Sequence, residues 1–233
     1  MLLAIFDVDG TLVHSGRRDS RCFAGVYETL YGRPFTGIDW RQYPHVTDLT
    51  ILDTALMQHF GRTSVEAEIR DFQALYLARL QAARDNDPAP FQEVPGASAL
   101  IAHLLERPLE YRACIATGGW RRPAELKLRH IGVPAEALPV TGADGFRTRQ
   151  EILQSAIDDA RARWGNFHKT VYIGDAVWDV HTTREMGLDF LGVAYTADAG
   201  ELESLGVRHI LPDFLDQSLF FEKVHAAVPP VGT

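Results

Sequence analysis

The residues with the clearest chemical potential lie near the start of the chain, where the motif DVDGT at 7–11 directly follows the apolar run 2–6. A short apolar run of this kind is typical of a strand buried in a parallel sheet. Because side chains alternate along an extended strand, Asp7 and Asp9 leave the same face. Two such carboxylates repel each other unless a cation lies between them, and hard divalent ions prefer oxygen ligands. The pattern therefore indicates chemistry at a bound metal.

A second acidic pair follows another run of strand-forming residues at 170–173. Gly174 and Asp175 come directly after this run, and Asp179 follows four residues after Asp175. We expect the two carboxylates to share one face of a helix that begins there. Ligands bind outside the carboxyl ends of strands in open α/β sheets, so both acidic pairs are expected at one edge of the sheet.

A third apolar run, at 111–116, ends in Thr117 and Gly118. A hydroxyl group followed by small residues at a strand end suits anion binding by side-chain and backbone donors. Three predicted strand ends therefore carry a carboxylate pair, a hydroxyl with accessible amides, and a further carboxylate pair.

The elements that must position these residues follow from hydrophobic periodicity. Between 15 and 92 the apolar residues recur at helical spacing and no convincing strand is found. From 93 onward the pattern alternates between strands and helices, which predicts a parallel sheet covered by helices. The expected strands are 2–6, 112–116, 138–141, 170–174, 190–194 and 209–211.

In this order and spacing the motifs resemble those of the haloacid dehalogenase-like (HAD) hydrolases, in the phosphoglycolate-phosphatase-like branch. The match rests on DVDGT at 7–11, Thr117, and the GDxxxD motif that contains Asp175 and Asp179. The resemblance implies an α/β fold, with a Rossmann-like parallel-sheet core at 1–14 and 93–233. It also implies an inserted, all-helical C1 cap domain at 15–92.

The resemblance also implies a Mg²⁺-dependent phosphatase that hydrolyses a small-molecule phosphomonoester. Asp7 would form an aspartyl-phosphate, and Asp9 would serve as general acid and base. Asp7, Asp175 and the main-chain carbonyl of Asp9 would bind the Mg²⁺ ion. Thr117 and the amide of Gly118 would bind the phosphoryl oxygens.

One motif of the family departs from its usual form. The family places a lysine before the helix that precedes the fourth-motif strand, whereas the lysines of this chain are at 127, 169 and 223 only. Arg149 is the best positional candidate for the missing cation, and Arg147 is the alternative. Arginine supplies a permanent charge and a forked set of donors. Asp179 would then orient Arg149 or a metal-bound water.

Other functions within the superfamily remain open. A haloacid dehalogenase usually lacks the second aspartate, so Asp9 argues for phosphate chemistry. Sugar phosphomutases of the family tend to use a cap lysine, and residues 15–92 contain none. A non-catalytic phosphate-binding member is a third alternative, against which the intact Asp7, Asp9 and Asp175 argue. A receiver-type signalling domain shares an acidic pocket but would be about half as long.

A Thr-Asp pair at 47–48, ahead of a predicted helix, has two interpretations. It resembles the family's substrate-binding loop, but Thr47 or Asp48 could instead cap the helix by accepting hydrogen bonds from its free amides. We favour the capping interpretation.

Composition narrows the class of protein. At 233 residues and 46% hydrophobic content, the chain is long enough to bury a large core. Its formal net charge of −8 and the absence of a run of Lys or Arg residues argue against nonspecific binding of nucleic acid. Its two cysteines cannot form a disulfide framework, and Cys114 is expected to be a core residue. The first apolar run is too short for a signal peptide or a membrane span. We therefore expect a cytoplasmic enzyme without a membrane partner, as a monomer or a homodimer.

Overall fold

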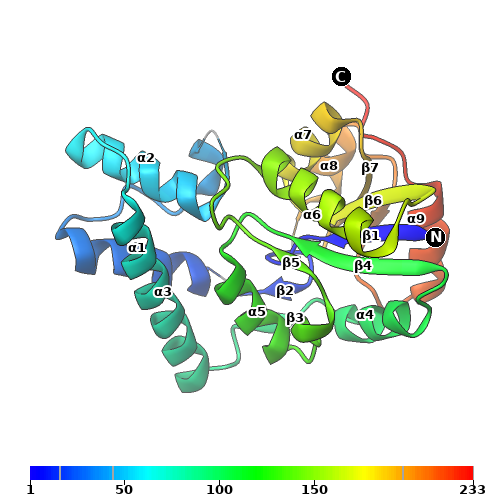
Figure 1. Cartoon of the computed structure of the whole chain (residues 1–233), viewed down its shortest axis with the longest axis horizontal. Helices are drawn as coiled ribbons and strands as arrows, with labels where there is room; N and C mark the ends of the chain where they lie inside the picture. The colour runs from blue at the N-terminus through cyan, green and yellow to red at the C-terminus, as the bar shows by residue number, and fades with distance from the viewer. Residues whose placement is uncertain (16, 44, 196, 233) are drawn as a thin grey trace.

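A parallel β-sheet forms the centre of the computed structural model, which describes residues 1–15, 17–43, 45–195 and 197–232 (Figure 1). Within these residues, six strands pair in the order β5-β4-β1-β6-β7-β8, and every pair is parallel. Their bounds are β1 (Leu2–Phe6), β4 (Tyr111–Ala116), β5 (Val140–Thr141), β6 (Lys169–Gly174), β7 (Asp189–Val193) and β8 (Ile210–Leu211). The predicted α/β fold with a Rossmann-like sheet is confirmed.

Helices cover both faces of this sheet. One face packs against α4 (Ala97–Glu106), α5 (Arg121–His130) and α9 (Gln217–Ala226). The other packs against α6 (Arg149–Trp164), α7 (Val177–Met186) and α8 (Ala199–Ser204). Strand β1 alternates between them, with Leu3 and Ile5 on the α6 side and its even-numbered residues on the α4 side. Asp7 continues the odd-numbered series, so its carboxylate emerges on the side where α6 begins.

A helical segment is inserted between the first and second core strands of the sequence. It contains α1 (Arg18–Tyr31), a short 3-10 turn η1 (Trp40–Gln42), α2 (Asp48–Phe60) and α3 (Glu66–Asn86). Figure 1 shows these three α-helices beside the sheet rather than on its faces. The chain enters and leaves the segment through β2 (Val13–His14) and β3 (Gln92–Glu93), which pair antiparallel. These strands were not expected, because two residues are too few to produce an alternating pattern.

Aromatic packing joins the helical segment to the core. Phe23 of α1 lies with its ring 4.7 Å from that of Phe72 in α3 and 5.9 Å from that of Trp120, which precedes α5. Trp120 is almost completely buried. Aromatic pairs at this separation stabilise an interface beyond the area that they bury.

The structure bears on two further expectations, the burial of Cys114 and the absence of a membrane span. Cys114 lies in β4 and is fully buried, which confirms its assignment to the core. Among the described helices, none is both long and apolar enough to cross a lipid bilayer.

Strand β1 lies inside the sheet, between β4 and β6, and its side chains are buried. We therefore expect truncation of Ile5 to be strongly destabilising. Its side chain is 0% exposed, whereas the side chain of Leu109 is 89% exposed. Ile5→Ala should lower the free energy of unfolding by about 2–5 kcal/mol, because it leaves a cavity. Leu109→Ala is the matched control and should change it by less than about 0.5 kcal/mol. Urea denaturation measures both, and equal effects would contradict the packing described for β1.

Candidate active site

The predicted site residues meet at one edge of the sheet. Strands β4, β1 and β6 are neighbours, and at their carboxyl ends lie Thr117, Asp7 and Asp175. A cavity of about 630 Å³ opens there, between the sheet and the helical segment. Residues from both sides line it: Asp7, Asp9, Thr117, Gly118 and Arg149 from the core, and Asp19, Trp40, Asp48 and Tyr76 from the helical segment.

Three carboxylates converge beside the cavity. One oxygen from each of Asp7, Asp175 and Asp179 lies within 4.8 Å of the others. We expected Asp175 and Asp179 to share a helix face, but α7 begins at Val177, so Asp175 precedes the helix. Asp175 extends from the end of β6, and Asp179 turns back toward it from the first turn of α7. The expected proximity is therefore correct, although its expected geometric cause was wrong.

Gly10 makes room for this cluster. Its φ angle is +88°, in the left-handed region that favours glycine. A Cβ atom at this position would also overlap the carboxylate of Asp175. The glycine of the DVDGT motif is therefore required both by the turn and by the close approach of Asp175. The Oδ1 atom of Asp175 accepts a hydrogen bond of 3.1 Å from the Thr11 hydroxyl.

The three acids lack sufficient positive charge among the described residues. Burial raises the pKa of Asp7 to about 6, against the lowering effect of the Arg149 guanidinium and with a further increase from Asp179. Burial and the neighbouring carboxylates also raise the pKa of Asp175. Within the described chain, Asp7 Oδ1 is buried without a hydrogen-bond partner. An orphaned carboxylate oxygen beside two further carboxylates fits a hard divalent cation, which would supply the missing charge.

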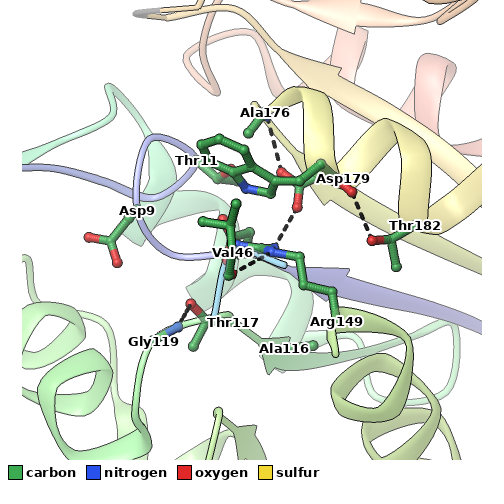
Figure 2. Close-up of polar contacts among 12 residues, drawn as sticks. Asp9, Thr11, Val46, Ala116, Thr117, Gly119, Arg149, Ala176, Asp179 and Thr182 are labelled. Carbon is green, nitrogen blue, oxygen red and sulfur yellow. Dashed lines mark hydrogen bonds and ion pairs between the residues drawn. The ribbon is translucent and has the colours of Figure 1, made fainter. Parts of the chain in front are cut away.

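Arg149 is the cation nearest to the three acids. Its Nη1 donates to Asp179 Oδ1 at 2.6 Å (Figure 2) and lies 3.9 Å from Asp7 Oδ1. The central carbon of the guanidinium lies 5.8 Å from the centre of the Trp178 ring. Thr148 caps α6 through a capping box with Glu151, and this cap sets Arg149 in the first position of the helix. Burial alone would lower the pKa of Arg149, but the carboxylates of Asp179 and Asp7 raise it, so the guanidinium stays charged.

Arg147 occupies a different environment. Its guanidinium pairs with Asp53 of α2, and its main-chain carbonyl accepts a hydrogen bond of 2.7 Å from the Thr50 hydroxyl. Both contacts are made to the helical segment rather than to the acidic cluster. Of the two arginines considered for the family's missing lysine, only Arg149 lies beside Asp7.

Asp179 is satisfied by its own neighbours. Besides Arg149, its oxygens accept hydrogen bonds from the Tyr172 hydroxyl at 3.3 Å and from the Ala176 amide at 3.1 Å. Its burial is complete. A carboxylate held by three donors has little capacity left to bind a cation directly, so its position suits the orientation of Arg149.

Thr117 and Gly118 form a compact loop between β4 and α5. The Thr117 hydroxyl accepts a hydrogen bond of 3.3 Å from the Gly119 amide, and the Thr117 side chain is buried. A Cβ at Gly118 would overlap both the Val46 carbonyl and the guanidinium of Arg149. The loop therefore requires a glycine at this position for close approach to the helical segment.

Asp9 lies apart from the other three acids. Its carboxylate points away from Arg149 (Figure 2), and both of its oxygens accept hydrogen bonds from Lys127 Nζ, at 2.7 and 2.6 Å. Burial raises the pKa of Asp9 to about 7, although the ammonium group of Lys127 opposes this rise. The two aspartates of the DVDGT motif therefore have different partners.

Lys127 was not predicted as a site residue, because it lies outside the stretch in which the family's lysine is expected. A signal was present, because Lys127 lies at helical spacing among Ala124 and Leu128, on the apolar face of α5. A lysine on a buried helix face needs acidic partners, and the sequence does not indicate which ones.

The two residues of the Thr-Asp pair at 47–48 make different contacts. Thr47 caps α2, since its hydroxyl accepts a hydrogen bond from the Thr50 amide at 3.2 Å. Asp48 instead lines the cavity, where its Oδ2 accepts a hydrogen bond of 2.8 Å from the Trp120 amide. Burial, together with the nearby Asp19, raises the pKa of Asp48 to about 8.

This shift makes the stability of the protein depend on pH. Between its ordinary pKa of 3.8 and about 8, Asp48 keeps in the folded state a proton that the unfolded chain loses, so its contribution to stability falls as pH rises. Asp48→Asn retains an acceptor for Trp120 but cannot ionise. The variant should therefore gain stability relative to the wild type between pH ~5 and pH ~8, measured by urea denaturation. The exposed Asp158→Asn is the control, and identical pH profiles for Asp48→Asn and the wild type would refute the assignment.

Comparison with known proteins shows the family to which the chain belongs. A family model described as haloacid dehalogenase-like hydrolase matches residues 1–187. A phosphoglycolate phosphatase of Rhodospirillum rubrum is 27% identical over 90% of this chain and 86% of its own length. Another, from Mesorhizobium japonicum, is 19% identical over 83% of this chain and 82% of its own length.

The fold is likewise shared with solved structures. A hydrolase from Pseudomonas syringae superposes with a TM-score of 0.70 over 96% of this chain and 99% of that protein, at 19% sequence identity. The family model covers most of the sequence, including the strand ends that carry Asp7, Thr117 and Asp175. The chain is therefore an enzyme of the haloacid dehalogenase-like hydrolase family, similar to its phosphoglycolate-phosphatase-like branch.

Proposed function

We propose that this enzyme is a Mg²⁺-dependent phosphatase that hydrolyses a small-molecule phosphomonoester through an aspartyl-phosphate on Asp7. The observation that carries the proposal is the buried Asp7 Oδ1, which has no hydrogen-bond partner in the described chain and lies 3.9 Å from Arg149 Nη1. The names of the two curated relatives support a phosphatase, with phosphoglycolate as the first substrate to test.

The environment of Asp7 suits a nucleophile. The other carboxylates beside it are held by donors, Asp175 by Thr11 and Asp179 by Arg149. In the first step, an oxygen of Asp7 attacks phosphorus, the new O–P bond forms, and the ester oxygen departs with a proton from Asp9. In the second step, Asp9 takes a proton from water, which attacks phosphorus, releases phosphate and restores Asp7.

Thr117, Gly118 and Arg149 are proposed to bind the phosphoryl oxygens. All three line the cavity beside Asp7, and together they offer a hydroxyl, a main-chain amide and a guanidinium. Donors that are fixed before the reaction stabilise negative charge as it develops in the transition state. Asp179 and Tyr172 would keep the guanidinium of Arg149 in place.

Asp7 and Asp175, with the main-chain carbonyl of Asp9, are the proposed Mg²⁺ ligands. When bound, the ion reduces the repulsion between an anionic nucleophile and an anionic phosphoryl group. The raised pKa values of Asp7 and Asp175 support this assignment, because a cation there would lower both.

The helical segment is proposed to act as a cap domain, at 15–92, over a core at 1–14 and 93–233. Two of its contacts with the core lie beside the loop that contains Thr117 and Gly118, here called the phosphoryl-binding loop. The Asp48 amide donates to the Gly118 carbonyl at 2.8 Å, and Arg149 Nε donates to the Val46 carbonyl at 3.2 Å. A cap in this position would exclude water and contact the part of the substrate that does not react. We further propose a cytoplasmic location, consistent with Cys22 and Cys114 being unpaired.

Removal of the nucleophile tests the proposal. Wild-type protein should hydrolyse p-nitrophenyl phosphate with Mg²⁺ and lose this activity in EDTA, while Asp7→Asn should lower kcat by at least ~10³-fold. Asp158→Asn, which changes an exposed carboxylate, is the matched control. Turnover by Asp7→Asn at the wild-type rate, or full activity in EDTA, would contradict the mechanism. A panel of phosphomonoesters that includes 2-phosphoglycolate would then identify the substrate class.

The two arginines should have very different effects. Arg149→Ala removes a donor to the phosphoryl group and should lower kcat/KM by ~10²–10³-fold. Arg147→Ala removes only an ion pair with the helical segment, so its effect should be below ~10-fold. The same assay measures both variants. A greater loss in Arg147→Ala than in Arg149→Ala would transfer the phosphoryl-binding role to Arg147.

A further inference from the structure

A buried ammonium group connects Asp9 to the helical segment. Lys127 Nζ lies 2.7 and 2.6 Å from the two oxygens of Asp9 and 2.7 Å from Asp19 Oδ2 of α1. An ammonium group has three N–H donors, and these three acceptors use all of them. The proposed mechanism assigns no role to this lysine.

Asp9 lies between the buried Lys127 and the cavity. The Lys127 side chain is 2% exposed, whereas that of Asp9 is 37% exposed and lines the cavity. Asp9 Oδ2 and Thr117 Oγ1 lie 4.0 and 3.8 Å from the point that a Cβ on Gly119 would occupy. The lysine therefore supports the Asp9 carboxylate from behind, while the carboxylate faces the phosphoryl-binding loop.

The third acceptor belongs to the helical segment. Asp19 also accepts a hydrogen bond from the Tyr76 hydroxyl of α3, so two helices of this segment hold one carboxylate against a lysine of the core. The side chain of Asp19 is 16% exposed, and Tyr76 is nearly buried. A buried cation with three charged hydrogen bonds has a defined position, because loss of any partner leaves a charge unpaired.

We propose that Lys127 is a positioning residue. It holds the Asp9 carboxylate on the side of the cavity from which the leaving group departs, and through Asp19 it makes this position depend on the docked helical segment. The inference rests on the proposed function, since it concerns the residue that would protonate the leaving oxygen.

A change in leaving-group dependence follows from this role. Phenyl phosphate needs a proton on its departing oxygen far more than p-nitrophenyl phosphate does, because p-nitrophenolate is the more stable anion. The two esters have the same ring and the same phosphoryl group. Since kcat/KM covers only the steps up to departure of the first product, its ratio for the two esters reports how well Asp9 is placed.

Lys127→Met tests the proposal with a side chain of similar length and no charge. The variant should lower kcat/KM for phenyl phosphate by ~100-fold and for p-nitrophenyl phosphate by less than ~5-fold. Lys169→Met is the matched control, because Lys169 also pairs with a carboxylate, Asp189 at 2.6 Å, but at the amino end of β6. It should change both values by the same factor. Equal losses for the two esters in Lys127→Met, or no loss, would overturn the proposal.

A second variant covers the case in which Lys127→Met does not fold. Lys127→Met combined with Asp19→Asn leaves one fewer buried charge unpaired, and it should show the same selective loss on phenyl phosphate. Circular dichroism checks the fold of both variants, and failure of both to fold would mean that the lysine is needed for the fold itself, which contradicts a positioning role. Wild-type protein that hydrolyses neither ester would instead refute the proposed function, and this inference with it.

Discussion

The structure depends on how several carboxylates can be buried at one edge of a sheet. Asp7, Asp175 and Asp179 bring oxygens within 4.8 Å of one another, and Arg149 is the cation that the described chain places beside Asp7. Burial disfavours the ionised form of each carboxyl group, and the neighbouring carboxylates repel it. Both effects raise the pKa values of Asp7 and Asp175. The three carboxylates could hold a metal ion, which would supply the missing positive charge.

The remaining elements hold each acid in a distinct environment. Strand alternation sends Asp7 toward α6, whose first residue is Arg149, while Asp9 meets Lys127 on α5. Asp179 turns back from α7 and is held by Arg149, Tyr172 and the Ala176 amide. In the proposed mechanism, these different partners correspond to different roles for one chemical group: nucleophile for Asp7, proton carrier for Asp9 and support of Arg149 for Asp179.

Much of the fold follows from local patterns in the sequence. Buried parallel strands appear as short apolar runs, and the motif residues follow their ends, so the meeting of Asp7, Thr117 and Asp175 could be predicted. Position in the sequence favours Arg149 over Arg147, but it does not show their partners, Asp7 and Asp179 for Arg149 and Asp53 for Arg147, which only three-dimensional packing brings together. Lys127 was missed for a related reason. Its partners, Asp9 and Asp19, are 118 and 108 residues away in the sequence, so spacing does not reveal them.

The proposed mechanism requires Asp7 and Asp175 to share one divalent cation. Anomalous diffraction from crystals of the protein soaked in Mn²⁺ would locate this ion, since Mn²⁺ prefers the same oxygen ligands as Mg²⁺ and gives a strong signal. We expect one peak within bonding distance of a carboxylate oxygen from both residues, and its loss in Asp175→Asn. A peak bound by neither carboxylate, or no peak at saturating Mn²⁺, would show that Asp7 and Asp175 do not form a metal site.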